Sequence, residues 1–293
     1  SYNCVAGAMK GSFRNNFNGT LSISYLLRQF RFMNTFSLGM NNSEDSPYGT
    51  FSDYVSLNPY WNPYDENGRV VKSFTTFGSS TGTTSIANPL WEASINKFDK
   101  EKYTNLRNTF RVEWDVVKGL KLSTNVGYSS QTNRGDRFSP KSSNDFNQTT
   151  DPDAMGSYTW EYREMHSWQW SFNASYGNTF GRHSIFAGVD GSLYETKNLG
   201  YMLWVRGFAN DKLTDISNAA GFANDRPSST DTQSRQAGFT MTGNYNYDSR
   251  YFFDFSYRLD GSSSFGSSNR FAPFWSIGFG YTISQENFFQ ERV

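Results

Sequence analysis

The residues best suited to hold a ligand are aromatic side chains in two long polar stretches of the chain. Aromatic faces stack on apolar ligand surfaces, and tyrosine adds a hydrogen bond. These side chains could therefore contact a sugar ring or a peptide; the alternative is that they pack the polar stretches on themselves or against a capping partner. The candidates are Tyr60, Trp61, Tyr64 and Trp91 in residues 43–103, and Tyr158 and Trp160 in residues 132–162.

Metal-ligating and catalytic residue types occur in the chain, but they lack the spacing of a metal site or an active site. Oxygen-bearing side chains cluster at Asp65-Glu66-Asn67-Gly68, but the alternating ligand positions of a calcium loop are missing, and Asn-Gly favours a plain turn. His166 and His183 have no companion at a metal-ligand spacing, and Cys4 is the one cysteine. No nucleophile stands with a candidate base or acid pair. We therefore expect no metal, no cofactor and no enzyme activity.

Composition restricts the class of protein. The 293 residues contain 27 Lys+Arg and 27 Asp+Glu, whereas a nucleic-acid-binding protein usually has a basic excess, so nucleic acid is not expected as a partner. Aromatic residues make up 18% of the chain although all hydrophobic residues reach only 36%. No apolar run of about 18 residues is present, which excludes a membrane-spanning helix. A β-barrel remains possible, because its strands need only every second residue to be apolar.

The strongest structural signal is the alternation between Gln236 and Ile283. Apolar and aromatic residues occupy every second position there, and polar or small residues occupy the positions between them. A period of two places the two sets on opposite faces of a sheet, which suits a wall between lipid and water. The residues expected to face lipid are Phe253, Phe255, Trp275, Ile277, Phe279 and Tyr281.

The same alternation recurs in six further segments, which gives nine expected strands in all. Short turns join the strands into hairpins, and the long polar segments separate the hairpins. Outer-membrane barrels have this arrangement of short periplasmic turns and long extracellular loops. The expected strands are 17–25, 32–40, 110–116, 120–129, 168–176, 185–193, 236–247, 251–260 and 275–283, and the expected loops are 43–103, 132–162, 198–233 and 260–272.

An odd number of strands cannot close a single-chain antiparallel barrel, and open strand edges in lipid leave backbone groups unpaired. The nine strands are therefore expected to be part of a larger barrel. The residues after Ile283 are interpreted as a turn into a further strand or a short helix.

Several ordered motifs resemble the late barrel strands of the SusC-like (SusC/RagA-type) TonB-dependent transporters. The resemblance extends from about residue 11 to 290, and the ordered set carries it rather than any one piece. The motifs are Asn58-Pro59, Pro63-Tyr64-Asp65-Glu66-Asn67-Gly68, Asn88-Pro89-Leu90, Lys118-Gly119-Leu120, 244–251, 258–266, Asn269-Arg270-Phe271, Phe274-Trp275-Ser276 and 283–288.

The resemblance implies an all-β transmembrane antiparallel β-barrel of about 22 strands in the outer membrane of Bacteroidetes-type bacteria. Such proteins import oligosaccharides or peptides, work with a SusD-like surface lipoprotein, and are powered through the TonB complex. Residues 1–293 would be an incomplete part of the barrel domain, and the plug domain, TonB box and C-terminal strand are expected to lie outside this chain. In this orientation loop 260–272 is extracellular and Asp248-Ser249-Arg250 is a periplasmic turn.

A second hypothesis is a soluble or surface-attached carbohydrate-binding β-protein. In that case the aromatic faces of the strands would form the core of a sandwich, and residues 1–293 would fold without detergent.

Overall fold

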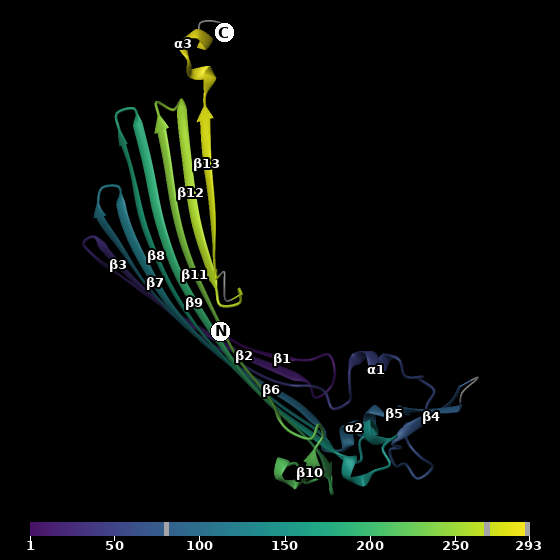
Figure 1. Ribbon diagram of the computed structural model, residues 1–293. Helices are drawn as coiled ribbons and strands as arrows, with labels where there is room; N and C mark the ends of the chain where they lie inside the picture. Colours follow the sequence, from purple (N-terminus) through teal and green to yellow (C-terminus); the bar gives the residue numbers. More distant parts are fainter. Residues whose placement is uncertain (79–81, 267–269, 291–293) are drawn as a thin grey trace.

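The computed structural model describes residues 1–78, 82–266 and 270–290, and it consists mainly of one antiparallel sheet (Figure 1). The sheet has 11 strands in the order β1-β2-β3-β6-β7-β8-β9-β11-β12-β13, with β10 paired to β9. Its strands are β1 (Tyr2–Ala6), β2 (Phe13–Leu27), β3 (Phe30–Glu44), β6 (Phe98–Val117), β7 (Leu120–Ser139), β8 (Ser157–Phe180), β9 (His183–Phe208), β10 (Ala219–Phe222), β11 (Ser228–Tyr247), β12 (Tyr251–Ser262) and β13 (Phe271–Tyr281).

Smaller elements lie in the connections. A separate hairpin consists of β4 and β5, and the helical segments are short. The strands of the hairpin are β4 (Ser73–Gly78) and β5 (Gly82–Ala87). The helical segments are α1 (Phe51–Val55), α2 (Pro89–Ser94), η1 (Asn144–Phe146), η2 (Pro152–Ala154), η3 (Ile216–Asn218), η4 (Ile283–Gln285) and α3 (Asn287–Gln290). Among the described residues, none of the helices has the length and apolar character needed to cross a membrane.

Each of the nine expected strands is present, and each is longer than the alternation predicts, most of all β6, β7, β8, β9 and β11. The expected loop 132–162 contains the end of β7 and the start of β8, and loop 198–233 contains the end of β9 and the start of β11. Loop 43–103 likewise loses its last residues to β6. The strands are longer because their backbone hydrogen bonds continue into polar segments, where neither face of the sheet carries an apolar row and alternation is therefore not visible.

The other differences from the prediction are local. β1, β4, β5 and β10 are additional short strands. β13 ends at Tyr281, so Ile283 does not share its face and instead begins the 3₁₀ turn η4. The chain then continues into the short helix α3, one of the two expected outcomes. Asn269 of the family motif lies outside the described residues.

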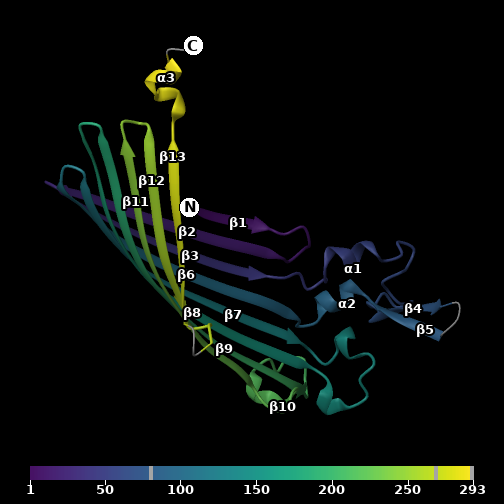
Figure 2. The ribbon, with the colours of Figure 1, turned by 45° about the horizontal axis from the view of Figure 1, so that its top comes forward.

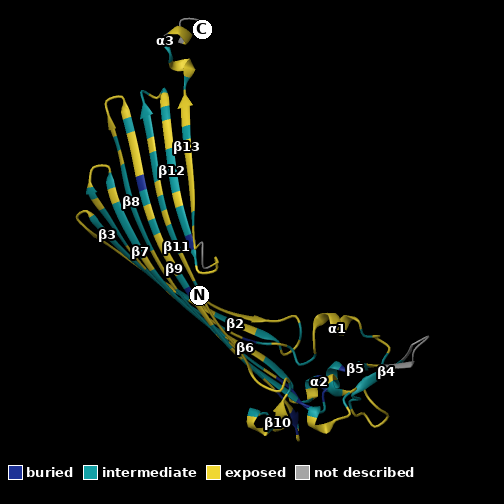
Figure 3. Ribbon diagram, in the orientation of Figure 1, coloured by how far each residue is buried: buried dark blue, intermediate teal, exposed yellow. Residues whose placement is uncertain are grey.

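The strand register places most of the apolar residues of the long strands on one face. On β12, Phe253 lies between Tyr245 of β11 and Phe279 of β13, while its neighbour Asp254 lies between Asn244 and Gly278. A hollow is lined mainly by residues of the polar face from β3 across to β12, so the polar face is the concave one. Figure 3 shows that the long strands consist almost entirely of exposed and partly buried residues.

Hydrogen bonds and ion pairs join the side chains of the concave face. Arg111 contacts Glu113 at 2.8 Å and Arg258 contacts Asp260 at 2.7 Å. The Nδ2 atom of Asn173 donates to Asp190 Oδ1 at 2.6 Å. A wet interior is compatible with this face, because its side chains are mainly polar or charged.

The apolar face is not covered by a second layer. Among the described residues, the buried hydrophobic side chains are only Phe138, Val205 and Phe208, and they lie at the loop end of the sheet. Trp275 and Phe279 are 71% and 82% exposed. The sandwich hypothesis required these aromatic faces to pack as a core, and this is wrong: the sheet is an incomplete antiparallel barrel wall.

Tight turns close the hairpins at the other end of the sheet, as predicted. Asp248 and Ser249 both lie in the left-handed region, with φ values of 55° and 57°. This backbone conformation matches the twist of a tight two-residue hairpin turn. At Gly119, with φ of 89°, an added Cβ would lie 2.4 Å from the carbonyl oxygen of Gly177. A larger residue at Gly119 would therefore push adjacent hairpins apart.

Candidate functional site

The long connections gather at one end of the sheet, opposite the tight turns (Figure 2). Residues 45–97 form the largest of them and contain α1, β4, β5 and α2. Local sequence explains both helices: Thr50 and Asp53 form a reciprocal capping box at α1, and Asn88 caps α2 with Pro89 at its first turn. These contacts satisfy backbone N–H groups at the helix starts and give the loop end a defined shape.

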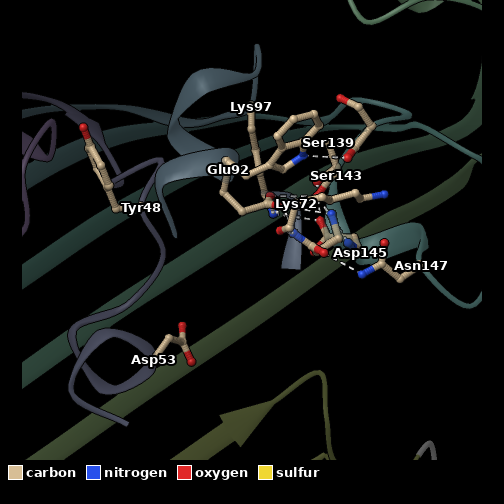
Figure 4. Close-up of polar contacts among 12 residues, drawn as sticks. Tyr48, Asp53, Lys72, Glu92, Lys97, Ser139, Ser143, Asp145 and Asn147 are labelled. Atoms are coloured by element: carbon tan, nitrogen blue, oxygen red, sulfur yellow. Dashed lines mark hydrogen bonds and ion pairs between the residues drawn. The ribbon is translucent and has the colours of Figure 1, made fainter. Parts of the chain in front are cut away.

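A partly buried polar cluster, here called the anchor cluster, ties two connections together. It consists of Glu92, Lys97, Ser143, Asn144 and Asp145 (Figure 4). Glu92 is 6% exposed and accepts hydrogen bonds from Lys97 Nζ at 3.0 Å and Ser143 Oγ at 2.8 Å. Its other carboxylate oxygen accepts from the backbone N–H and the side-chain amide of Asn144 at 2.8 and 2.9 Å. Each oxygen of the buried carboxylate is therefore paired.

Lys97 lies between two carboxylates. Its Nζ atom is 2.9 Å from Asp145 Oδ2 and 3.0 Å from Glu92 Oε2, and Ser139 Oγ donates to Asp145 at 2.6 Å. Burial alone would raise the pKa values of Glu92 and Asp145, but these hydrogen bonds and the Lys97 charge outweigh it, so both pKa values lie below the ordinary range. Burial would lower the pKa of Lys97, yet the two carboxylates raise it.

These pKa shifts predict how the loop end responds to pH. Groups with lowered pKa values stabilise the folded state above their unfolded pKa, about 4.5 for Glu92 and 3.8 for Asp145, and that stabilisation is lost as pH falls through the folded values. Lys97, whose pKa is raised, contributes its full stabilisation of the folded state below its unfolded pKa of 10.5. We expect hydrogen exchange in residues 88–97 and 140–147 to be slow at neutral pH and to accelerate below about pH 4. Unchanged protection, after correction for the intrinsic exchange rate, would contradict this.

A small apolar core lies beside the anchor cluster. Phe138 packs against Phe208 with ring centroids 5.2 Å apart in an edge-to-face arrangement, and Phe98 and Tyr158 pack around them. The backbone N–H of Ser142 donates to Asp211 Oδ1 at 3.2 Å. This core and this hydrogen bond connect the ends of β7 and β9, so three connections are held as one unit.

The structure separates the six candidate ligand residues. Tyr60 is 93% exposed, whereas Trp61 stacks on Phe74 with ring centroids 5.1 Å apart. Tyr64 is 46% exposed beside the turn at Asp65, where Asp65 Oδ1 accepts from the backbone N–H groups of Asn67 and Arg69 at 2.8 Å. Residues 65–68 thus form the expected turn. Tyr60, Trp61 and Tyr64 lie together on one connection.

The remaining three candidates have structural partners. Trp91 Nε1 donates to the carbonyl oxygen of Ser142 at 3.0 Å, which links α2 to the anchor region. Tyr158 and Trp160 lie on β8 rather than in a loop. The hydroxyl of Tyr158 donates to Asp136 at 2.7 Å, and Trp160 stacks on Tyr162. The polar atoms of Trp91 and Tyr158 and the ring of Trp160 therefore already have partners within the chain.

An apolar groove beside α1 was not predicted as a unit. Phe51, Tyr54 and Val55 are each more than half exposed, and they line the groove with Leu57 and Trp61. The Thr50-Phe51-Ser52-Asp53 capping pattern could have revealed the helix that presents them. The groove has the aromatic and apolar lining that a ligand or a partner protein would need.

The residues expected to face lipid lie on the apolar face. Phe253 and Phe255 on β12 pair with Phe279 and Ile277 on β13. Their exposed fractions range from half-buried Phe255 to 82% for Phe279. Within the described residues, no group of three or more His, Cys, Asp or Glu side chains is placed to hold a metal ion.

Comparison with known proteins gives matches in sequence and in fold. The chain is 26% identical over 206 residues to TonB-dependent receptor P3 of Formosa agariphila, a match that covers 70% of this chain and 20% of that protein. The structure of the RagAB peptide transporter matches with a TM-score of 0.71 and 21% identity, covering 95% of this chain and 31% of that chain. The ferric citrate transporter FecA matches with a TM-score of 0.55 and 9% identity, covering 94% of this chain and 35% of that chain. No protein-family model matches.

Proposed function

We propose that this chain, which is part of a SusC-like TonB-dependent transporter, forms a section of the barrel wall and the extracellular loops of an outer-membrane importer. The chain spans about a fifth of the curated relative and about a third of the RagAB chain. The import activity therefore belongs to the whole transporter. It is a transport activity and not an enzymatic one.

One observation supports this proposal above the others. The register aligns apolar residues on one face of nine consecutive long strands and polar residues on the other, with the long connections at one end. A soluble protein rarely exposes so large an apolar surface, whereas a barrel in lipid requires it. The tight turns then lie on the periplasmic side and the anchor cluster lies outside the cell.

The imported nutrient is proposed to be an oligosaccharide or a peptide, bound with the help of Tyr60, Trp61 and Tyr64. A SusD-like surface lipoprotein is the proposed partner at the loop end, and the TonB complex is the proposed source of energy. The exposed aromatic side chains and the groove beside α1 support a ligand or partner at this end.

Uptake by a strain that lacks the transporter tests the function. Fluorescent oligosaccharides and oligopeptides too large for porins are supplied to the deletion strain and to the same strain carrying the gene. We expect the gene to restore energy-dependent uptake of one of these classes. Restoration of neither class would contradict the proposed import.

Replacement of Tyr60 tests the ligand surface. Because the ring is almost fully exposed, Tyr60→Ala is expected to leave assembly unchanged and to weaken ligand binding by about 1 kcal/mol, or about five-fold, through the lost stacking contact. Tyr2→Ala is the control, since Tyr2 lies on β1 opposite Phe17 and outside residues 45–97. Isothermal titration with the transported nutrient measures both; equal affinities for wild type and Tyr60→Ala would remove Tyr60 from the site.

A further inference from the structure

Two hollows at the loop end of the structure share a wall. The first is the groove beside α1, which has a volume of about 960 Å³. The second, here called the carboxylate pocket, has a volume of about 530 Å³ and lies between residues 45–53, the start of β6 and the end of β7. Ala8 and Met9 line both hollows. One extended ligand can therefore occupy the two together, and each hollow has the size of a ligand site.

The groove beside α1 suits an apolar side chain better than a sugar. Phe51, Tyr54 and Val55 line it, and each is more than half exposed. The side-chain amides of Asn58 and Asn88 also line it, but they already bond to backbone groups of the same loop. Sugar hydroxyls would find few free partners there, and burying a hydroxyl without a hydrogen bond is unfavourable.

The carboxylate pocket opens on the concave face, which the proposed function assigns to the barrel interior. Asp99 lies on β6 an even number of positions before Arg111 of that face, and Arg137 of β7 donates to it at 2.6 Å. Asp45 is beside them, because its backbone N–H donates to the carbonyl oxygen of Asp99 at 2.9 Å. A ligand in this pocket would therefore lie where the loops meet the interior.

The charges around the two hollows are unequal. The charged residues of the carboxylate pocket are Asp45, Asp53, Glu92, Asp99, Asp145, Lys97 and Arg137. Lys10 is the charged residue that lines the groove beside α1, so five carboxylates face three cations over the two hollows. On the concave face next to the pocket, Glu101 and Glu161 are balanced by Arg14 and Arg163. The excess of negative charge is therefore not cancelled by that part of the sheet.

The excess is located at Asp45 and Asp53. Within the described residues, neither carboxylate forms an ion pair with a lysine or arginine, and the exposed Asp45 carboxylate makes no hydrogen bond. Asp53 accepts hydrogen bonds only from Thr50. The Lys10 ammonium lies over the ring of Tyr48 instead, 5.9 Å from its centroid. Charge complementarity favours a cationic group as the occupant of this pocket.

We propose that the imported nutrient is a peptide, with a cationic group at Asp45 and Asp53 and a neighbouring apolar side chain in the groove beside α1. The cationic group is a lysine or arginine side chain or the amino terminus. The inference rests on the proposed function and narrows the nutrient to one class. A neutral oligosaccharide supplies neither the charge nor the apolar side chain.

Uptake by the deletion strain carrying the full-length gene tests this with matched fluorescent probes. The parent probe is an amino-terminally acetylated peptide with adjacent lysine and phenylalanine residues. In the first derivative glutamate replaces the lysine, and in the second serine replaces the phenylalanine. In the third, glutamine replaces the lysine and the amino terminus is free. The last probe is a neutral oligosaccharide of similar mass. The half-saturating concentration for energy-dependent uptake is measured for each probe.

Variants of the transporter separate the two hollows. Asp45→Asn removes the unpaired carboxylate, Asp45→Lys reverses its charge, and Tyr54→Ser removes an exposed ring from the groove. Asp115→Asn is the matched control, because Asp115 lies on the same face of β6 at the tight-turn end and its side chain is 68% exposed. Heat-modifiable migration first establishes that each variant is assembled, so a failed barrel is distinguished from a failed site.

The wild type is expected to take up the lysine peptide, the peptide with the free amino terminus, or both, at a half-saturating concentration about five-fold below that of the glutamate derivative, as for one exposed ion pair. The probe with the lower value identifies the source of the cation. Asp45→Asn should remove this charge preference, and Asp45→Lys should reverse it. Tyr54→Ser should weaken only the preference for phenylalanine over serine. Asp115→Asn should keep both preferences.

Three outcomes would overturn the proposal while leaving the import function in place. They are equal half-saturating concentrations for all peptides, a charge preference that Asp45→Asn leaves unchanged, and uptake of the oligosaccharide alone. Uptake of none of the probes would contradict the proposed function itself, and this inference with it.

Discussion

Phe255→Arg in the full-length transporter is expected to prevent assembly of a stable barrel. Phe255 lies on the apolar face, between Gly243 of β11 and Ile277 of β13. An arginine facing lipid near the midplane costs about 2–4 kcal/mol, and neighbouring side chains on this face are apolar and cannot pair with it. The measurement is the amount of heat-modifiable transporter in the outer membrane.

Ser256→Arg is the matched control for this substitution. Ser256 is the next residue on the same strand, and it lies on the concave face between Thr242 and Ser276. The guanidinium can remain in a wet interior there, so assembly is expected to be close to wild type. Equal assembly of the two variants would contradict the assignment of lipid to one face of the sheet and water to the other.

Lys97→Met is expected to release the loop end while leaving the barrel assembled. The substitution leaves the buried Glu92 carboxylate without its cation. Breaking a buried pair costs roughly 3–5 kcal/mol, and because Lys97 is 28% exposed we expect a smaller loss of about 2–3 kcal/mol in the opening free energy. Hydrogen exchange of residues 88–97 and 140–147 measures that free energy.

Lys100→Met provides the comparison. Lys100 pairs with Glu44 at 3.8 Å, and its side chain is 49% exposed, so the loss should stay below about 1 kcal/mol. If the two variants opened the loop end equally, the anchor cluster would not be what holds residues 45–97 against residues 140–156.

The transmembrane part of the fold could be predicted because alternation is a local property. Phe253 and Asp254 differ in polarity at adjacent positions, and a strand must place them on opposite faces. The ends of the strands could not be found in this way. In residues 228–233 every side chain is polar, so no face stands out, yet the ladder with β9 continues there because its backbone groups still need partners.

The candidate site was harder to predict because its contacts join distant residues. Glu92 and Asn144 are 52 positions apart, and neither residue belongs to a motif that marks it for burial. Composition did identify the aromatic residues of the loops. It did not distinguish exposed Tyr60 from Trp91, whose indole N–H is used to link two connections, because that difference arises only when the connections pack.

The central claim is that adjacent residues of β12 and β13 face lipid and water alternately. Single cysteines at positions 253, 254, 278 and 279 of the full-length transporter, with Cys4 replaced by serine, can be probed in outer-membrane vesicles with a water-soluble and a lipid-partitioning thiol reagent. We predict that positions 253 and 279 react only with the lipid-partitioning reagent and that positions 254 and 278 react with the water-soluble one. Uniform reactivity at the four positions, or the reverse pattern, would contradict the barrel-wall assignment.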